Sequence, residues 1–215
     1  MRKQLSVLGL LLLASATPLQ AGDRAALGLK VGSLGIGLDL TARVNNWVSI
    51  RGTFSRYDFR RTSNESGNDY EGDFELGGYG VLCDVFPMRG NFRITGGLLK
   101  NRNNLELTST PSSPIAIGGS TYPPGVVGTL HGNVRFRPEA PYLGIGYGSA
   151  ARPGLPVRFV LDAGVMSQGR GEVSLSSSSG LIAPGDMESE RRQIEDEAGK
   201  YRFWPVIALG VSFRF

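Results

Sequence analysis

The sequence contains few side chains that could carry out catalysis or bind a metal. Its only histidine is His131 and its only cysteine is Cys83. One cysteine excludes an internal disulfide and any zinc or iron–sulfur site built from several cysteines. Cys83 falls in an apolar phase of its segment, where a thiol behaves as a small hydrophobic group. We therefore expect neither a metal nor a cofactor.

Serine-based catalysis also finds little support. The segment His131-Gly132-Asn133 places an amide two positions after the histidine, and an amide cannot act as the nucleophile. Serines are concentrated at Ser174 to Ser179, and such a serine-rich stretch is typical of a solvated loop. We expect that the protein is not an enzyme.

Charged side chains are the remaining group with a regular pattern. Nine of them alternate with apolar neighbours and would lie together on one side of a folded sheet. Buried charges are costly unless they are paired, so we expect a network of Arg or Lys with Asp that fills the interior. These residues are Lys30, Asp39, Arg51, Asp84, Arg93, Arg158, Asp162, Arg202 and Arg214.

Alternation along the chain predicts the elements that position these charges. Between residues 25 and 44, apolar residues recur with period two in two runs that meet at Gly32-Ser33, which predicts a tight hairpin pairing Val31 with Leu34. One face of this hairpin is apolar and the other is small or charged. In a membrane barrel the apolar face contacts lipid and the polar face lines the interior.

The same pattern predicts about eight strands and an all-β fold. Short turns alternate with three long polar loops, at 61–70, 108–127 and 176–200, which is typical of an antiparallel up-and-down transmembrane β-barrel. The expected strands are 24–31, 34–44, 48–60, 70–85, 91–107, 128–148, 157–175 and 201–215.

Two segments depart from simple alternation. Residues 128–148 change phase around Pro138 and Pro141, which fits either one strand bent at a bulge or a separate strand above the membrane. Asp186 to Lys200 lacks alternation and is rich in helix formers, so a short helix is expected in the last outer loop, with a charged loop as the alternative.

The first 21 residues predict export. Arg2 and Lys3 precede a short apolar stretch and a small-residue exit at Ala21, the arrangement of a cleaved signal peptide. Residues 22–215 would form the barrel domain. Lys and Arg number 23 against 19 Asp and Glu, and removing Arg2 and Lys3 leaves 21 − 19 = +2, too small an excess to indicate nucleic acid.

The last six residues carry a specific motif. Gly210, Phe213 and Phe215 match a glycine followed by aromatics three and five places later, and this resembles the C-terminal signal of outer-membrane barrels. The chain is similar to the small eight-stranded barrels of the OmpA and OmpW type. The resemblance implies a bacterial outer-membrane location, contact with lipopolysaccharide and the barrel assembly machinery, and a monomeric state.

Two functions remain open from the sequence. The first is a structural or surface-interaction protein, whose charged, plugged lumen anchors long extracellular loops for a surface ligand. The alternative is a narrow channel or carrier for small hydrophobic molecules. An eight-stranded interior is just wide enough for side chains to fill it or to hold one small ligand. The lumen therefore distinguishes the two hypotheses.

Overall fold

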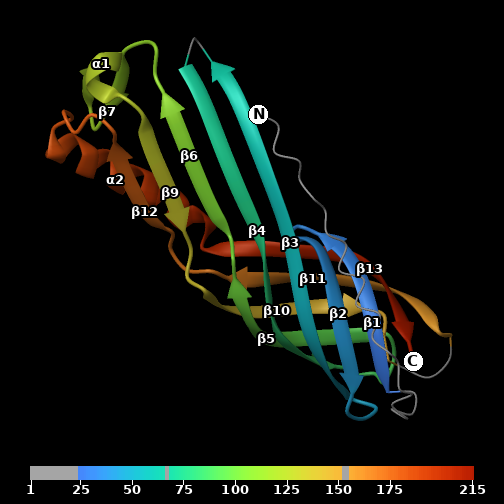
Figure 1. Cartoon of the computed structure of the whole chain (residues 1–215). Helices are drawn as coiled ribbons and strands as arrows, with labels where there is room; N and C mark the ends of the chain where they lie inside the picture. The colour runs from blue at the N-terminus through green and yellow to red at the C-terminus, as the bar shows by residue number, and fades with distance from the viewer. Residues whose placement is uncertain (1–23, 66–67, 152–154) are drawn as a thin grey trace.

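Eight antiparallel strands close into a barrel in the computed structural model, which describes residues 24–65, 68–151 and 155–215 (Figure 1). Each strand pairs with the next around the ring, and the last pairs with the first. The predicted signal peptide lies outside the described residues. In ring order the strands are β1 (Ala25–Gly32), β2 (Gly35–Arg43), β3 (Val48–Glu65), β4 (Asn68–Val85), β5 (Phe92–Asn101), β10 (Glu139–Tyr147), β11 (Val157–Ser167) and β13 (Phe203–Arg214).

The barrel wall follows the predicted alternation. Leu29 and Ile36 point outward and are 62% and 66% exposed, whereas Asp39 and Arg51 point inward and are 6% and 4% exposed. Because successive side chains of a strand point to opposite faces, one apolar and one polar surface arise from the same strands. The predicted all-β barrel of about eight strands is confirmed.

The first hairpin differs from the predicted register. Val31 pairs with Ile36 and Gly32 with Gly35, so Ser33 and Leu34 form the turn. Gly35 has a φ of 92°, in the left-handed region that favours glycine. Leu34 consequently turns into the barrel and is buried, and the predicted pairing of Val31 with Leu34 was wrong.

Five strands continue as a sheet beyond the barrel. β3 and β4 run on without a break, and β6 (Asn104–Thr110), β9 (Leu130–Arg135) and β12 (Glu172–Ser177) add to β4 in that order. We call this part, above Arg56 of β3, the projecting sheet (Figure 1). Breaks separate β6 from β5, β9 from β10 and β12 from β11, so residues 128–148 form two strands rather than one.

The predicted outer loops contain more regular structure than expected. The prediction of a loop at 61–70 was wrong for most of its length, because β3 and β4 stay paired from Arg61↔Gly72 to Glu65↔Asn68. The second loop contains strands β7 (Ile115–Ile117) and β8 (Ser120–Tyr122) and helix α1 (Pro124–Val127).

The third predicted loop contains helix α2 (Pro184–Ala198), followed by a 3₁₀ turn at Gly199–Tyr201. The short helix expected there is confirmed. Within the described residues, none of the helices has the length and apolar character needed to cross a membrane.

Candidate functional site in the barrel lumen

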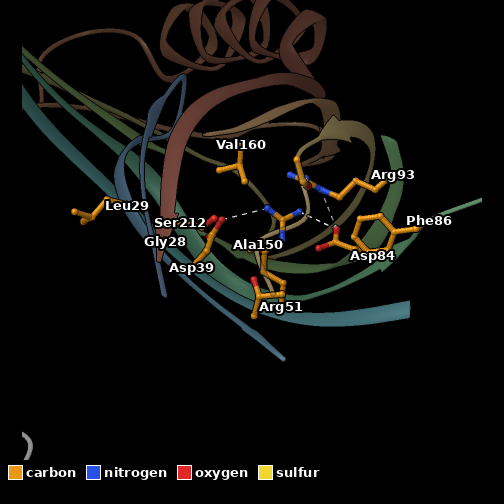
Figure 2. Close-up of a pocket in the computed structure, with 12 residues that line it drawn as sticks. Gly28, Leu29, Asp39, Arg51, Asp84, Phe86, Arg93, Ala150, Val160 and Ser212 are labelled. Carbon is orange, nitrogen blue, oxygen red and sulfur yellow. Dashed lines mark hydrogen bonds and ion pairs between the residues drawn. The ribbon is translucent and has the colours of Figure 1, made fainter. Parts of the chain in front are cut away.

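Arg51 of β3 lies at the centre of the lumen (Figure 2). Its Nη1 atom is 3.1 Å from Asp39 Oδ2 and 3.0 Å from Asp162 Oδ2. Its Nη2 atom is 3.0 Å from Asp84 Oδ1 and 3.1 Å from Asp162 Oδ1. One guanidinium therefore joins carboxylates from β2, β4 and β11, using the planar fork of donors that arginine provides.

Two more cations balance these carboxylates. Arg93 Nη2 lies 2.8 Å from Asp162 Oδ1, and Lys30 Nζ lies 2.7 Å from Asp39 Oδ1. Three cations then face three carboxylates, so the formal charge of this cluster is 3 − 3 = 0. Pairing of this kind offsets the cost of desolvating each charge. We call the cluster the ion network, and its members are Lys30, Asp39, Arg51, Asp84, Arg93 and Asp162.

The other three predicted lumen charges lie elsewhere. Arg158 and Arg214 are half-buried near the end of the barrel opposite the projecting sheet, where Arg158 pairs in register with Ser212. Arg202 is exposed, and its guanidinium stacks 5.0 Å from the ring of Phe203. The structure therefore places Arg202 outside the lumen, because β13 begins only at Phe203 and alternation does not reach back to Arg202.

A buried apolar layer lies in the lumen between the ion network and the projecting sheet. Its members come from five strands and the first turn, and Trp204 packs against them. This layer was not predicted from the sequence, although Leu82 and Val206 share the inward phase of Asp84 and Ala208, and Leu34 was expected to face outward. The buried residues are Leu34, Leu82, Leu99, Ala140, Tyr142, Met166 and Val206.

A group of amide side chains lies at the strand breaks. Gln168 is completely buried, and its Oε1 accepts hydrogen bonds from Asn103 Nδ2 at 2.8 Å and Asn101 Nδ2 at 3.3 Å. Its Nε2 donates to the carbonyl oxygen of Tyr201 at 2.8 Å. Buried amides need such partners. These bonds connect the breaks of β5–β6 and β11–β12 to the start of β13.

Two small cavities lie beside the ion network and the apolar layer, and a larger space of about 220 Å³ is lined by Ser49, Phe86 and Ser149. One cavity beside Arg51 and Arg93 has a volume of about 20 Å³, and a second beside Lys30 and Tyr142 has about 30 Å³. A single water molecule needs roughly 10–15 Å³ by this measure. Each of these two small cavities can therefore hold one or two waters, and neither can hold a small organic ligand.

The residues of the predicted assembly motif lie on both faces of the chain end, with the two aromatics on the outer face and the glycine on the inner face. Phe213 and Phe215 point outward and are 53% and 56% exposed. Gly210 is inside, where an added Cβ would lie 2.5 Å from the carbonyl oxygen of Leu29. The aromatic residues therefore belong to the outer apolar surface, and the glycine permits close approach of β1.

The histidine and the serines lie on the projecting sheet. His131 Nδ1 is 3.3 Å from Thr108 Oγ1, and His131 pairs in register with Ser176 of β12. The serine-rich segment is thus partly a strand, and the loop expected from its composition was wrong for residues 174–177. Cross-strand pairing satisfies its backbone, which composition alone does not reveal.

Comparisons with known proteins bear on the fold. No family model matches the sequence, and no curated protein does. The crystal structure of Acinetobacter baumannii CarO2 is similar, with a TM-score of 0.61 and 21% identity, covering 89% of this chain and 98% of that one. Acinetobacter baumannii CarO has a TM-score of 0.59 and 19% identity, with the same coverage. The chain therefore has the fold of the small eight-stranded outer-membrane barrels.

Proposed function

We propose that this chain is a bacterial outer-membrane protein whose filled barrel anchors the projecting sheet on the cell surface for interaction. The observation that supports the proposal is the set of buried side chains that meet inside the barrel. The ion network, the apolar layer and the buried amides follow one another along the barrel axis, and the cavities beside the first two measure about 20 and 30 Å³. A barrel of this kind can hold a surface domain in place without conducting.

The outer surface of the barrel supports insertion in a membrane. Large apolar side chains such as Leu143, Phe159 and Val211 are exposed around the wall, as the lipid-facing band of a membrane barrel requires. We further propose contact with lipopolysaccharide, assembly through the motif at Gly210, Phe213 and Phe215, and a monomeric, non-catalytic protein. The signal peptide predicted at residues 1–21 would direct export.

A channel or carrier using the lumen is the weaker candidate. Such a route needs a continuous cavity, whereas Arg51 bridges strands on opposite sides of the ring. Opening it would separate buried charges from their partners, which costs several kcal/mol per charge. Any hydrophobic ligand would therefore need a site outside the lumen.

Conductance in planar bilayers tests the filled lumen. The purified full chain should first show the heat-dependent gel shift of a folded barrel. It should then insert without producing steady unitary currents, because the proposed plug would block a continuous aqueous path. Steady single-channel conductance from the folded protein would contradict the proposal.

Cysteine labelling in intact cells tests the orientation. In a Cys83→Ser background, Arg192→Cys on α2 should react with a membrane-impermeant maleimide, because α2 belongs to the proposed surface domain. Met88→Cys, in the short turn between β4 and β5, is the matched control, since Met88 is 79% exposed at the opposite end. It should react only after permeabilisation. Labelling with the reverse pattern would contradict the orientation.

A further inference from the structure

The two faces of β3 and β4 exchange polarity where they leave the barrel. On the outer face, Phe54 and Tyr79 pair within the barrel, and the next residues of this face along β3 are Arg56 and Asp58, which form an exposed ion pair. On the inner face, buried Ser55 is followed by Tyr57. Along β3 the barrel segment is therefore apolar outside and polar inside, whereas the segment in the projecting sheet is polar outside and apolar inside.

Three aromatic side chains form the inner face of the projecting sheet near the barrel. The rings of Tyr57 and Phe59 are stacked with centroids 6.3 Å apart, and the rings of Phe59 and Phe74 are 5.6 Å apart. Leu76 pairs with Tyr57, and Leu107 pairs with Gly72 on the same face. We call Tyr57, Phe59 and Phe74 the aromatic row.

Helix α2 covers only the other end of this face. Ala198 and Ile194 of α2 pack with Val134 of β9 and Val173 of β12. By contrast, Tyr57 and Phe59 are 48% and 42% exposed, and Leu107 is 44% exposed. The apolar face is thus covered at β9, at β12 and at Leu105 of β6, but it is exposed at Tyr57, Phe59 and Leu107.

The barrel wall is low directly beside the aromatic row. β2 ends its pairing with β3 at Ile36↔Arg56, and the turn at Ser33 and Leu34 closes the hairpin at that level. Figure 1 shows β1 and β2 stopping there while β3 and β4 continue upward. We call residues 33–35 the low rim.

Apolar surface continues across the low rim. Val31 and Ile36 on the outer wall are 58% and 66% exposed. At Gly35 the rim has no side chain, and there is no room for one, because a Cβ there would lie only 2.5 Å from the Cβ of Tyr57. The glycine backbone therefore contacts the aromatic row on one side and adjoins the outer apolar wall at Ile36 on the other.

We propose that an acyl chain of a lipid from the outer leaflet crosses the low rim and lies on the aromatic row. The proposal rests on the proposed outer-membrane location. Its occupant follows from continuity, since the aromatic row extends the surface that the barrel would present to lipid. Burial of exposed aromatic side chains against a hydrocarbon chain removes apolar surface from water and favours such an occupant.

Arg61 favours a lipid with an anionic headgroup. It pairs in register with Gly72, which places it on the inner face four residues beyond Tyr57, about 13 Å along the strand. Arg61 is exposed. A guanidinium binds phosphate oxygens through paired donors, so a headgroup at Arg61 would leave the chain running down over Phe59 and Tyr57 towards the rim.

Photocrosslinking in vesicles tests this proposal. The full chain is reconstituted in phosphatidylcholine vesicles that contain phosphatidylglycerol with a diazirine on one acyl chain, and labelled peptides are mapped by mass spectrometry. We expect labels on Tyr57, Phe59 or Phe74 as well as on the outer wall at Phe159, which is 77% exposed. His131, on the polar face of the projecting sheet, should remain unlabelled.

A matched pair of variants separates docking from folding. Phe59→Asp places a charge on the aromatic row and should lower labelling of β3 and β4 about tenfold, because a buried carboxylate opposes the chain. Thr62→Asp adds the same charge on the opposite face of the same strand and should leave labelling unchanged. Tyr57→Ser is the second test, and the heat-dependent gel shift must be retained in each variant.

The outcomes distinguish this proposal from the proposed function. Absence of label at Phe159 would show that the barrel is not in the bilayer, which contradicts both. Label at Phe159 without label on the aromatic row would overturn the acyl-chain site alone. Crosslinks between two protein chains through Phe59, or labelling only by a free photoactivatable fatty acid added in detergent, would also overturn it.

Discussion

Arg51 Nη1 lies 3.0 Å from Asp162 Oδ2, and this ion pair spans the full width of the barrel. β3 and β11 are four places apart in a ring of eight strands, so they face each other across the lumen. Both side chains are buried, with exposed fractions of 4% and 7%. A bond of this kind fixes the distance between opposite walls as well as balancing charge.

Replacing Arg51 should therefore destabilise the barrel strongly. Arg51→Met leaves Asp39, Asp84 and Asp162 with one cation fewer, and removing one partner of a buried pair costs roughly 3–5 kcal/mol. The temperature at which the heat-dependent gel shift occurs should fall. Arg60→Met is the matched control, because Arg60 pairs with Asp73 on the exposed face, where solvent screens the ion pair and it adds little stability. Equal effects of the two variants would contradict a central role for Arg51.

The buried amides should control how firmly the projecting sheet is attached. Gln168→Leu leaves the Asn103 side chain and the Tyr201 carbonyl without their partner, at a cost of about 1–3 kcal/mol. Proteolysis near residues 199–202 and hydrogen exchange in β12 should both accelerate, while the barrel strands keep their protection. Asn133→Ala, which removes a half-exposed amide from the outer face, is the control. Unchanged exchange in Gln168→Leu would contradict the attachment.

Much of the barrel could be predicted from the sequence because its signal is strictly periodic. In β1, β2, β11 and β13, exposed apolar residues alternate with buried or half-buried inward residues along most of the strand. The ion network followed from the same phase, since charges such as Arg51 and Asp162 had to share one interior. Six of nine predicted charges are joined there.

The projecting sheet could not be predicted in the same way. The inward-facing residues of β3 are polar as far as Ser55 and apolar from Tyr57. The polarity of each face therefore changes within one strand. Periodicity alone therefore predicts that the strand ends near that point and that a loop follows at 61–70. The amides at Asn101, Asn103 and Gln168 also carry no periodic signal, because their role depends on strand breaks that only the fold brings together.

Close approach of β4 and β5 should make Gly80 sensitive to substitution. A Cβ at Gly80 would lie 2.1 Å from the carbonyl oxygen of Leu98, so Gly80→Ala must push the two strands apart. Folded yield and thermal stability should fall by an amount typical of overpacking, about 1–3 kcal/mol. Gly185→Ala in α2 has no atom within 4 Å of the new methyl group and should leave stability unchanged. A neutral Gly80→Ala would argue against this strand spacing.

The outward aromatic at the end of the chain should matter for assembly rather than for the lumen. Phe215→Ala should reduce the amount of folded protein in the outer membrane, because it removes the last residue of the predicted motif. Phe159→Ala removes an exposed aromatic of the same wall and should leave the yield close to that of the unaltered chain. Comparable loss in both variants would show that outer apolar surface, and not the motif, determines assembly.

Acid should loosen the start of α2 through Asp186. The hydroxyl of Tyr122 donates a hydrogen bond to Asp186, and this bond holds the pKa of the Asp186 carboxyl below its usual range. A lowered folded pKa means that the stabilisation is present above the ordinary pKa of the unfolded state and is lost as the pH falls through the folded value. Protection of α2 from proteolysis should therefore persist at pH 5 and decline below about pH 4, where unperturbed Asp groups titrate.

Tyr122→Phe supplies the control for this pH dependence. Because the variant has no donor for Asp186, the pKa of that carboxyl should rise towards its ordinary value when followed by nuclear magnetic resonance. Protection of α2 should then be lower at pH 5 and change less on acidification. Glu188 offers an internal comparison, since hydrogen bonds from Arg191 and Arg192 lower its pKa to about 2. These hydrogen bonds do not involve Tyr122. If Tyr122→Phe shifted Glu188 and Asp186 together, a general change in α2 rather than the Tyr122 hydrogen bond would explain the titration.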